Sequence, residues 1–578
     1  MNNKKNFLDF ISYQENPDRE GFILKETTDD KTNQPKGENQ EAQDENPTTR
    51  KALKKTSRSG GRQPEEKQMD GEPDAIRASL EQNKKIISKL YGLPKNKDLV
   101  IREFVIGTEP EISCFAVFID GLTDKAVQDL LFQALMLFAK RPLTKEKKNL
   151  APLVREHLLP GNQVALKNLF SDVLSSVNMG DTAVFLDGST EALLIETKGF
   201  EHRGVDRPQS EQTVRGPQEG FTETLRVNTA LIRKIIRNEQ LTTEMSTLGD
   251  RTKTMVAIMY LRDLANPDLV AEVKRRLESI KIDYIAESGI LSELIEDHPY
   301  NLNPTILTTE RPDRVASKII EGRVAIIVDG SPFVLVVPTT LYEQLQTGEE
   351  TYIRWQYGTY LRYLRALAFL VSFLAPGVYL SIVLFHHEMI PTELLLAIAG
   401  NREKVPFPSL VEVLLMEISF ELIREAGIRL PGVIGGTIGI VGALILGQAA
   451  VQANIVSPIL VILVAITGLA SFTIPDYALS FSLRIYRFAY IALGVTMGFF
   501  GIAIGIFSHM ILTANLKSFG VPYLSPVGPR TVGGVDVVYR MPVFFHDKRP
   551  DYVNPQDITS QPQVSRGWIK DNGGGKND

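Results

Sequence analysis

The sequence predicts a soluble α/β region of two related subdomains at the N-terminal side, followed by an α-helical polytopic membrane domain. Two observations support this fold class: a β-hairpin pattern that occurs twice before residue 350, and several long apolar runs that begin near residue 366. A helix of about 20 apolar residues matches the hydrocarbon thickness of a bilayer, so the apolar runs predict membrane spans. The net charge of -5 over 578 residues averages two unlike halves.

Residues 1–75 are rich in Asn, Gln, Lys, Glu and Asp and poor in apolar side chains. Such a composition buries too little apolar surface to fold, so we expect a disordered polar arm. The first residues carry charges and amides where a signal peptide has an apolar core, and the N-terminal half is therefore expected in the cytosol. The single cysteine, Cys114, excludes disulfides within the chain.

Two cytosolic α/β subdomains are predicted, at residues 76–240 and 241–350. Each contains an Asp-Gly pair between β-rich runs, at Asp187-Gly188 and Asp329-Gly330, and this pair suits the positive φ angles of a tight hairpin turn. The repetition favours two related units, although two unrelated hairpins would give the same pattern. In the second unit, strands at 255–261 and 282–285 around a helix at 268–280 predict a β-α-β order.

The membrane domain is predicted at residues 360–514 and a C-terminal tail at 515–578. Four spans are expected, at about 366–386, 433–453, 457–474 and 488–512, while residues 389–430 are re-entrant, interfacial or spanning. The run from Gly432 to Pro475 would be about 65 Å long as one helix, so it should break near Asn454 to Pro458. Arg362 and Arg365 precede the first span, and such cations favour the cytosolic side.

Short motifs in a fixed order add a family resemblance. They are Arg215-Gly216-Pro217-Gln218-Glu219-Gly220-Phe221 with Asn228 and Arg233 after it, Glu310-Arg311-Pro312-Asp313, Glu388-Met389-Ile390-Pro391-Thr392, Arg424-Glu425-Ala426-Gly427-Ile428-Arg429-Leu430-Pro431, and Gly447-Gln448-Ala449-Ala450-Val451. Spread over about residues 85–525, the motifs together resemble the GerA family of spore germinant receptor A subunits.

The resemblance implies a three-component receptor in the inner membrane of the dormant endospore. Its B subunit resembles an amino-acid permease, its C subunit is a lipoprotein, and its A subunits form a homo-oligomer that is a nutrient-gated ion channel. A non-conducting scaffold or signal-transducing subunit of the same complex is the alternative. A secondary transporter is disfavoured, because transporters are usually built from repeated spans and the repeat found here lies in the soluble half.

Two features of the run after Pro431 bear on ion passage. Small residues recur every four positions, which lets another helix approach closely: Gly435, Gly439, Ala443 and Gly447. Beside them lie the candidate pore residues Gln448, Val451, Gln452, Asn454 and Ile455. In an oligomer the glutamines would line a water-filled pore, and Val451 or Ile455 would close it. The alternative is that the amide side chains only form hydrogen bonds between helices.

A row of carboxylates is the second candidate site. Glu417, Glu421 and Glu425 recur every four residues, with Glu412 offset from them. Like charges on one helical face repel unless water or cations face them. The row therefore predicts either an interfacial helix with a solvated acidic face, partly neutralised by Arg424 and Arg429, or a vestibule that attracts cations.

The signature of Arg215, Gly216, Pro217, Glu219, Asn228 and Arg233 is charged and polar, and predicts a loop that enters a helix. We interpret it as an assembly or coupling surface, with Arg215 and Arg233 available to pair with Glu219 or Glu223. The sequence has no Walker loop, nucleophile elbow or cysteine-histidine cluster, so no enzyme activity, metal or cofactor is expected. Membrane lipid is an expected partner and nucleic acid is not.

Overall fold

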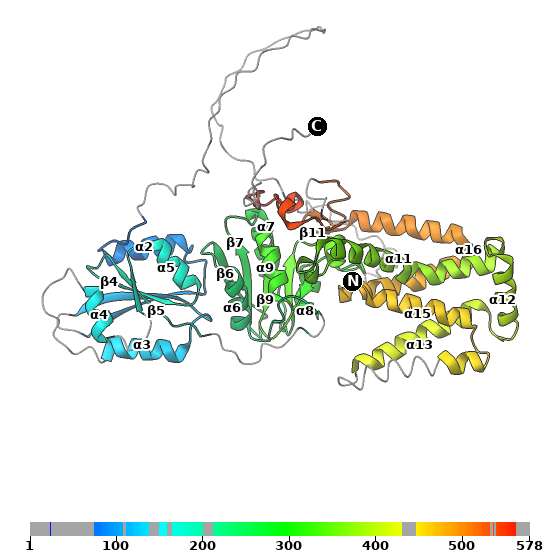
Figure 1. Cartoon of the computed structure of the whole chain (residues 1–578), viewed down its shortest axis with the longest axis horizontal. Helices are drawn as coiled ribbons and strands as arrows, with labels where there is room; N and C mark the ends of the chain where they lie inside the picture. The colour runs from blue at the N-terminus through cyan, green and yellow to red at the C-terminus, as the bar shows by residue number, and fades with distance from the viewer. Residues whose placement is uncertain are drawn as a thin grey trace, which may run out of the picture.

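The computed structural model describes residues 24, 74–107, 111–137, 150–158, 164–199, 208, 211, 213–429, 447–531, 536 and 539–561. Figure 1 shows three parts in a row: subdomain 1 in blue and cyan, subdomain 2 in green, and a helical region on the side of subdomain 2 away from subdomain 1. The polar arm expected at 1–75 lies outside the described residues except for positions 24, 74 and 75.

Subdomain 1 is a five-stranded antiparallel sheet with the strand order β1-β2-β4-β5-β3. Its elements are α2 (Leu80–Leu90), β1 (Leu99–Ile106), β2 (Ile112–Ile119), α3 (Lys125–Leu137), α4 (Leu150–Leu158), β3 (Val164–Lys167), α5 (Phe170–Asn178), β4 (Thr182–Leu186) and β5 (Ala192–Ile195).

Subdomain 2 repeats this plan with the strand order β6-β7-β9-β10-β8. Its elements are α6 (Leu225–Ile235), β6 (Leu241–Leu248), β7 (Thr254–Leu261), α7 (Pro267–Glu278), α8 (Ser288–Ile295), β8 (Leu307–Thr309), α9 (Pro312–Ile320), β9 (Val324–Val328) and β10 (Val334–Val337). Both faces of the sheet are buried: Val256, Ile258 and Tyr260 of β7 enter one apolar core, and Ala257, Met259 and Leu261 enter the other.

The prediction of two related α/β subdomains is confirmed, because helices and strands follow one another in the same order and the two sheets share one topology. The two hairpins turn at Gly188 and Gly330, with φ of 83° and 88°. One expectation was wrong: residues 282–285 form no strand, and the third strand of the unit is β8. Ile285 is buried beneath the sheet as part of a loop, so its apolar character reflects burial without strand pairing.

Two short helices, α10 (Leu341–Gln344) and η2 (Gly348–Thr351), connect subdomain 2 to the helical region. That region contains α11 (Trp355–Phe385), η3 (His387–Met389), α12 (Thr392–Arg402), α13 (Ser409–Arg429), α15 (Pro458–Phe472) and α16 (Tyr477–Asn515). Among the described residues, α11 and α16 are long and apolar enough to cross a membrane, and α15 is a shorter apolar helix. Figure 1 places α12 at the end farthest from the sheets.

The break expected near Asn454 lies between two helices. Helical backbone ends at Gln452, Asn454 adopts a φ of 53°, and α15 begins with Pro458 in its first turn. Proline is favoured there because its missing N–H would have no partner in the first turn of a helix. Residues 430–446, which hold the first part of the expected span 433–453, lie outside the described residues.

The helix α16 folds back on itself at Gly498. Gly498 has a φ of 61° and a ψ of -142°, a conformation that glycine adopts without strain. The rings of Tyr486 and His509 lie 4.4 Å apart, although 23 residues of straight helix would separate them by about 35 Å. α16 is therefore a hairpin of two antiparallel helices.

The expected single span at 488–512 is wrong, because the reversal at Gly498 lies within it. Small residues permit this reversal. A Cβ on Gly505 would lie 2.9 Å from the ring of Tyr490, and a Cβ on Gly494 would lie 2.4 Å from the carbonyl oxygen of Gly377 in α11. The two arms of the hairpin and α11 thus pack at distances that larger residues would prevent.

Both ends of the hairpin lie against subdomain 2, where the tail also begins. After α16, the strands β11 (Lys517–Ser518) and β12 (Val521–Pro522) are followed by η5 (Val543–Phe545) and η6 (Asp551–Val553). Asn266 of subdomain 2 donates a hydrogen bond of 3.1 Å to the carbonyl of Asn554, and Tyr552 donates one of 3.0 Å to Glu343. The described part of the tail therefore lies on the same side of the helices as the sheets.

Candidate functional site

The two subdomains are joined by an ion pair buried between them. Arg233 of α6 contacts Asp98, which precedes β1, with an Nη2 to Oδ1 distance of 2.8 Å, and both side chains are almost fully buried. The same guanidinium donates to Asn96 and to the carbonyl of Leu241. Arg233 of α6 therefore links subdomain 1 to the start of β6 in subdomain 2.

The pairing expected for the signature arginines was wrong. Arg233 points into the interface toward Asp98, so Glu219 pairs instead with Lys234, at 2.6 Å on the exposed side of α6. Arg215 is exposed, and its backbone N–H approaches Glu349 Oε1 at 3.3 Å. The expected helix is α6, and buried Asn228 fixes the loop before it by hydrogen bonds to Thr222 N and O at 2.8 and 2.6 Å.

The signature loop also packs against the segment that leads into the helices. Gly216 has a φ of 125°, and a Cβ there would lie 2.6 Å from the ring of Tyr352. The carbonyl of Pro217 accepts a hydrogen bond from Arg311, which is paired with Asp313 at 2.7 Å. Tyr352 donates to the same Asp313 carboxylate at 2.7 Å, so the loop and η2 share one buried polar cluster.

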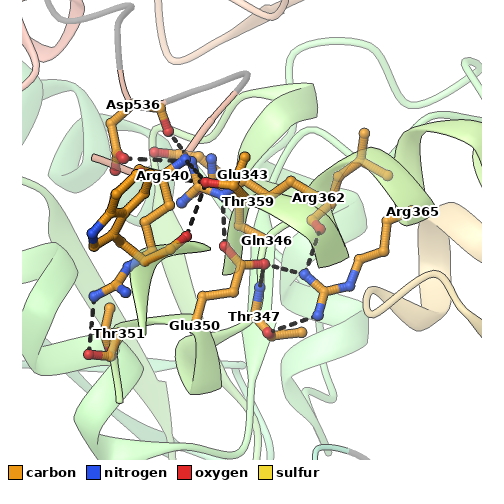
Figure 2. Close-up of polar contacts among 12 residues, drawn as sticks. Glu343, Gln346, Thr347, Glu350, Thr351, Thr359, Arg362, Arg365, Asp536 and Arg540 are labelled. Atoms are coloured by element: carbon orange, nitrogen blue, oxygen red, sulfur yellow. Dashed lines mark hydrogen bonds and ion pairs between the residues drawn. The ribbon is translucent and has the colours of Figure 1, made fainter. Parts of the chain in front are cut away.

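One link between subdomain 2 and the helices is a carboxylate held by two arginines (Figure 2). Glu350 of η2 is buried and contacts Arg362 Nε at 2.6 Å through one oxygen and Arg365 through the other. Arg365 also donates to Thr347 at 3.1 Å. Charge-assisted bonds of this kind are the stronger class of hydrogen bond, so η2 and the first turns of α11 form one rigid unit.

A second link involves the tail. Figure 2 shows Arg540 and Asp536 beside the first turns of α11. Arg540 donates to the carbonyls of Ile353 and Thr351 at 2.7 and 3.1 Å, and Arg362 donates to the carbonyl of Asp536. The tail thus also contacts the arginine and the backbone that surround Glu350.

A third link joins the hairpin ends to the loop between α8 and β8. Ser482 in the first arm of α16 donates to the carbonyl of Leu302. Beyond the second arm, Ser518 donates to the carbonyl of Thr305 at 2.6 Å, and Phe519 N–H donates to Asp297 at 2.6 Å. A movement of this loop would be passed directly to both arms of the hairpin.

Within this loop, Glu296 has an unusual protonation equilibrium. Burial raises its pKa from the ordinary 4.5 to about 7, and the nearby charges of Glu293 and Asp297 act in the same direction. A hydrogen bond from Thr305 at 3.4 Å opposes the shift. The carboxyl group is therefore half protonated near neutral pH.

Inside the helical region, the carboxylates of α13 meet arginines of α16. Glu417 contacts Arg487 at 2.5 Å with both side chains fully buried, and Arg487 Nε donates to the carbonyl of Ser372 in α11 at 2.7 Å. Glu421 accepts from Arg484 at 3.0 Å and from Arg424. Glu412 caps the break before α15 by accepting from Ser457 N–H at 3.1 Å.

These contacts bear on the acidic row. Glu417 is not a solvated carboxylate, because Arg487 neutralises it inside the bundle, and Glu425 is exposed. The expected neutralising partner Arg424 is present, and the side chain of Arg429 lies outside the described part. The vestibule hypothesis for Glu412, Glu417, Glu421 and Glu425 stays a prediction.

The candidate pore residues lie in the last turns of the short helix and in the break that follows it. Gln448, Gln452 and Asn454 are exposed, whereas Val451 and Ile455 are partly buried against a cluster that includes Leu380 and Leu460. Of the small-residue stripe, Gly447 is buried and a Cβ there would lie 3.4 Å from Val461. Gly435, Gly439 and Ala443 lie outside the described residues.

Sequence reasoning missed three residues that now stand out. Glu350 lies in a short polar segment with no periodicity, and Arg484 and Arg487 fall between the expected spans 457–474 and 488–512. From the sequence, Arg362 and Arg365 predicted only which end of the first span faces the cytosol. The sequence does contain one signal for this contact. Arg362 and Arg365 stand just before an apolar run, and Glu350 stands 12 and 15 residues before them.

The fold and the site define a class: tandem antiparallel α/β subdomains joined by buried ion pairs to a bundle of apolar helices. A sequence model described as Bacillus/Clostridium GerA spore germination protein matches residues 85–552. The chain belongs to the GerA family.

Curated relatives align with this chain over most of their own length. Spore germination protein KA of Bacillus subtilis (strain 168) is 41% identical over 86% of this chain and 92% of its own. Spore germination protein B1 of the same strain is 39% identical over 84% and 99%, and GerLA of Bacillus cereus is 36% identical over 81% and 94%.

A solved structure is also similar in sequence. It is the N-terminal domain of the A subunit of the Bacillus megaterium spore germinant receptor GerK3, 31% identical, which covers 45% of this chain and 95% of that chain with a TM-score of 0.33. The chain is an A subunit of a spore germinant receptor and acts in germination. It is a membrane protein with apolar helical spans, and subunits of this family are not enzymes.

The buried pair in the bundle predicts a large effect of Glu417→Gln. Removal of one partner leaves Arg487 buried without its counter-charge, which costs about 3 to 5 kcal/mol. We expect a marked fall in the thermal unfolding midpoint of the full chain in detergent, and partial recovery in Glu417→Gln/Arg487→Met. The matched control is Glu393→Gln on exposed α12. An unchanged midpoint together with altered cation selectivity would instead support a vestibule role.

The raised pKa of Glu296 predicts a pH dependence of stability. The folded state holds the proton more tightly than the unfolded chain, so the stability that this group contributes is complete below about pH 4.5 and is lost as the pH rises through about 7. Glu296→Gln should remove this part of the decline in the unfolding midpoint between pH 5 and 7.5. Glu278→Gln, an exposed site at the end of α7, should keep it. Equal slopes in both variants would refute the assignment.

Proposed function

We propose that this A subunit assembles with other copies of itself into a nutrient-gated ion channel of the spore inner membrane. A permease-like B subunit and a lipoprotein C subunit of the same receptor would complete the complex, with the α/β subdomains in the cytosol. The names of the relatives refer to germination and say nothing about ion conduction.

One observation carries the channel proposal. Gln448 and Gln452 are exposed on the protomer, one helical turn apart, in an apolar stretch that packs beside the first turn of α15 through Gly447 and Val461. Primary amides facing lipid would lose their hydrogen bonds, which costs several kcal/mol for each unsatisfied group. A second protomer or a column of water is needed to satisfy them, and a ring of A subunits supplies both.

The packing of the neighbouring residues supports a mobile pore wall. Val451 and Ile455 pack against an apolar cluster of the same protomer to which Leu380 of α11 belongs. In this arrangement the glutamines face outward and the apolar pair faces inward. A rotation of the short helix by about 60° would bring Val451 to the position that Gln448 now occupies, since residues 448 and 451 are three positions apart on a helix. Such a rotation would place Val451 in the path and close it by dewetting.

A non-conducting transducer is the second candidate, and the Glu350 junction favours it. Subdomain 2 is held to α11, to both hairpin arms and to the tail by buried polar contacts. These links suit a subunit that passes a conformational change between cytosol and membrane, whether or not ions pass through it.

The double variant Gln448→Leu/Gln452→Leu separates the two functions. We expect cation release from spores after nutrient addition to slow at least about tenfold, because an apolar ring opposes a continuous column of water. Spores should carry the variant as their sole copy of this chain. Thr496→Leu is the matched control, since Thr496 is exposed on α16 and, within the described part of the chain, its hydroxyl bonds only to carbonyls of its own helix.

Membrane extracts should show both variants at normal abundance and in complexes of normal size. Normal cation release from the glutamine variant would then contradict a pore at these residues and favour the transducer. A loss of the complex would show that the amides serve assembly.

A further inference from the structure

The tail carries a cluster of exposed aromatic and aliphatic side chains next to the helical region. Between Tyr539 and Phe545, four side chains are exposed: Tyr539 at 42%, Val543 at 59%, Phe544 at 37% and Phe545 at 57%. The rings of Phe544 and Phe545 lie 4.7 Å apart. Exposed apolar groups gathered in this way usually mark a contact surface.

This segment is fixed at both ends by hydrogen bonds. Near its first residue, Arg540 N–H donates to Thr359 at 3.2 Å, and the Arg540 side chain bonds to carbonyls just before α11. After it, Ser560 N–H donates to the carbonyl of Asp547 at 2.8 Å. The carbonyl of Val543 accepts from Gln561 at 2.7 Å. These hydrogen bonds fix the backbone of the segment, and its aromatic side chains remain exposed.

The position of the segment along α11 sets its depth. Arg362 donates to the carbonyl of Asp536, whose carboxylate accepts from Met541 N–H at 2.8 Å. Arg362 lies four residues, or about 6 Å of helix, before the charge-free run that begins at Ala366. The polar layer of a bilayer is about 5 to 8 Å thick on each side of the hydrocarbon, so the segment lies at the level of the head groups.

The exposed aromatic residues of α11 nearest to the charge-free run are those of a membrane interface. Tyr360 and Tyr363, six and three residues before Ala366, are exposed at 66% and 53%. Tryptophan and tyrosine gather at the boundary of hydrocarbon and water because their rings are apolar at one end and polar at the other. The tail segment adds phenylalanines to this boundary, and exposed Lys548 follows it.

We propose that Tyr539–Phe545 is an interfacial anchor that inserts Val543, Phe544 and Phe545 into the lipid surface on the side of the α/β subdomains. The lipid surface is continuous with the surroundings of α11, to which the segment is fixed. Aromatic and aliphatic side chains gain free energy there by leaving water, and lysine is drawn to anionic head groups. The anchor holds the tail, and with it the Glu350 cluster, against the membrane.

Fluorescence quenching by brominated lipid tests this anchor. The chain has two tryptophans, Trp355 and Trp568, and replacement of both by Phe gives a silent background. Phe545→Trp is added to the full chain, which is reconstituted in phosphatidylcholine and phosphatidylglycerol vesicles with or without brominated acyl chains. We expect at least a twofold loss of emission with brominated lipid and weak quenching by aqueous acrylamide.

Leu130→Trp in the same background is the matched control. Leu130 is exposed at 53% on α3 of subdomain 1, the part farthest from the helices in Figure 1, and its indole should be quenched by acrylamide alone. Lipid quenching no greater at position 545 than at 130 would overturn the proposal. So would an indole at 545 that neither quencher reaches, because another protein subunit would then cover the segment. An unchanged melting temperature of the background variant verifies that the chain is folded.

Discussion

The buried Glu350 carboxylate holds the soluble and membrane parts of this receptor subunit together. It accepts from Arg362 and Arg365 at the start of α11 while it caps the short helix η2 that ends subdomain 2. A carboxylate removed from water needs well-placed cations and further hydrogen bonds to offset its lost hydration. The junction is therefore specified closely, and the signature loop, the tail and η2 all converge on it.

The rest of the membrane half is arranged around this fixed point. α11 begins at the junction, and the hairpin of α16 packs along it through contacts that glycine makes possible at 377, 494 and 505. Because α16 reverses at Gly498, both of its arms begin or end against subdomain 2. The pair between Glu417 and Arg487 then ties α13 to the same hairpin. A displacement of subdomain 2 thus has direct routes to α11, α13 and α16.

The sequence predicted what depends on local pattern. The two hairpins followed from Asp-Gly turns at 188 and 330, the first membrane helix from its apolar length, and the break from Pro458. The reversal at Gly498 was not predictable in this way, because it lies in an apolar run whose composition is the same in a straight helix and in a hairpin. The α-helical spacing of Glu417 and Glu421 was visible, but their partners lie 70 and 63 residues away. Such pairs are set by tertiary packing, which no local pattern records.

The central claim is that Glu350 and Arg365 act as one unit across the junction, and a double-mutant cycle tests it most directly. Glu350→Gln, Arg365→Gln and the combined variant are compared by the unfolding of the full chain in detergent. The structure predicts that each single change costs about 3 to 5 kcal/mol and that the combined change costs little more than either one. Additive costs, or single changes with no effect on stability, would contradict the claim.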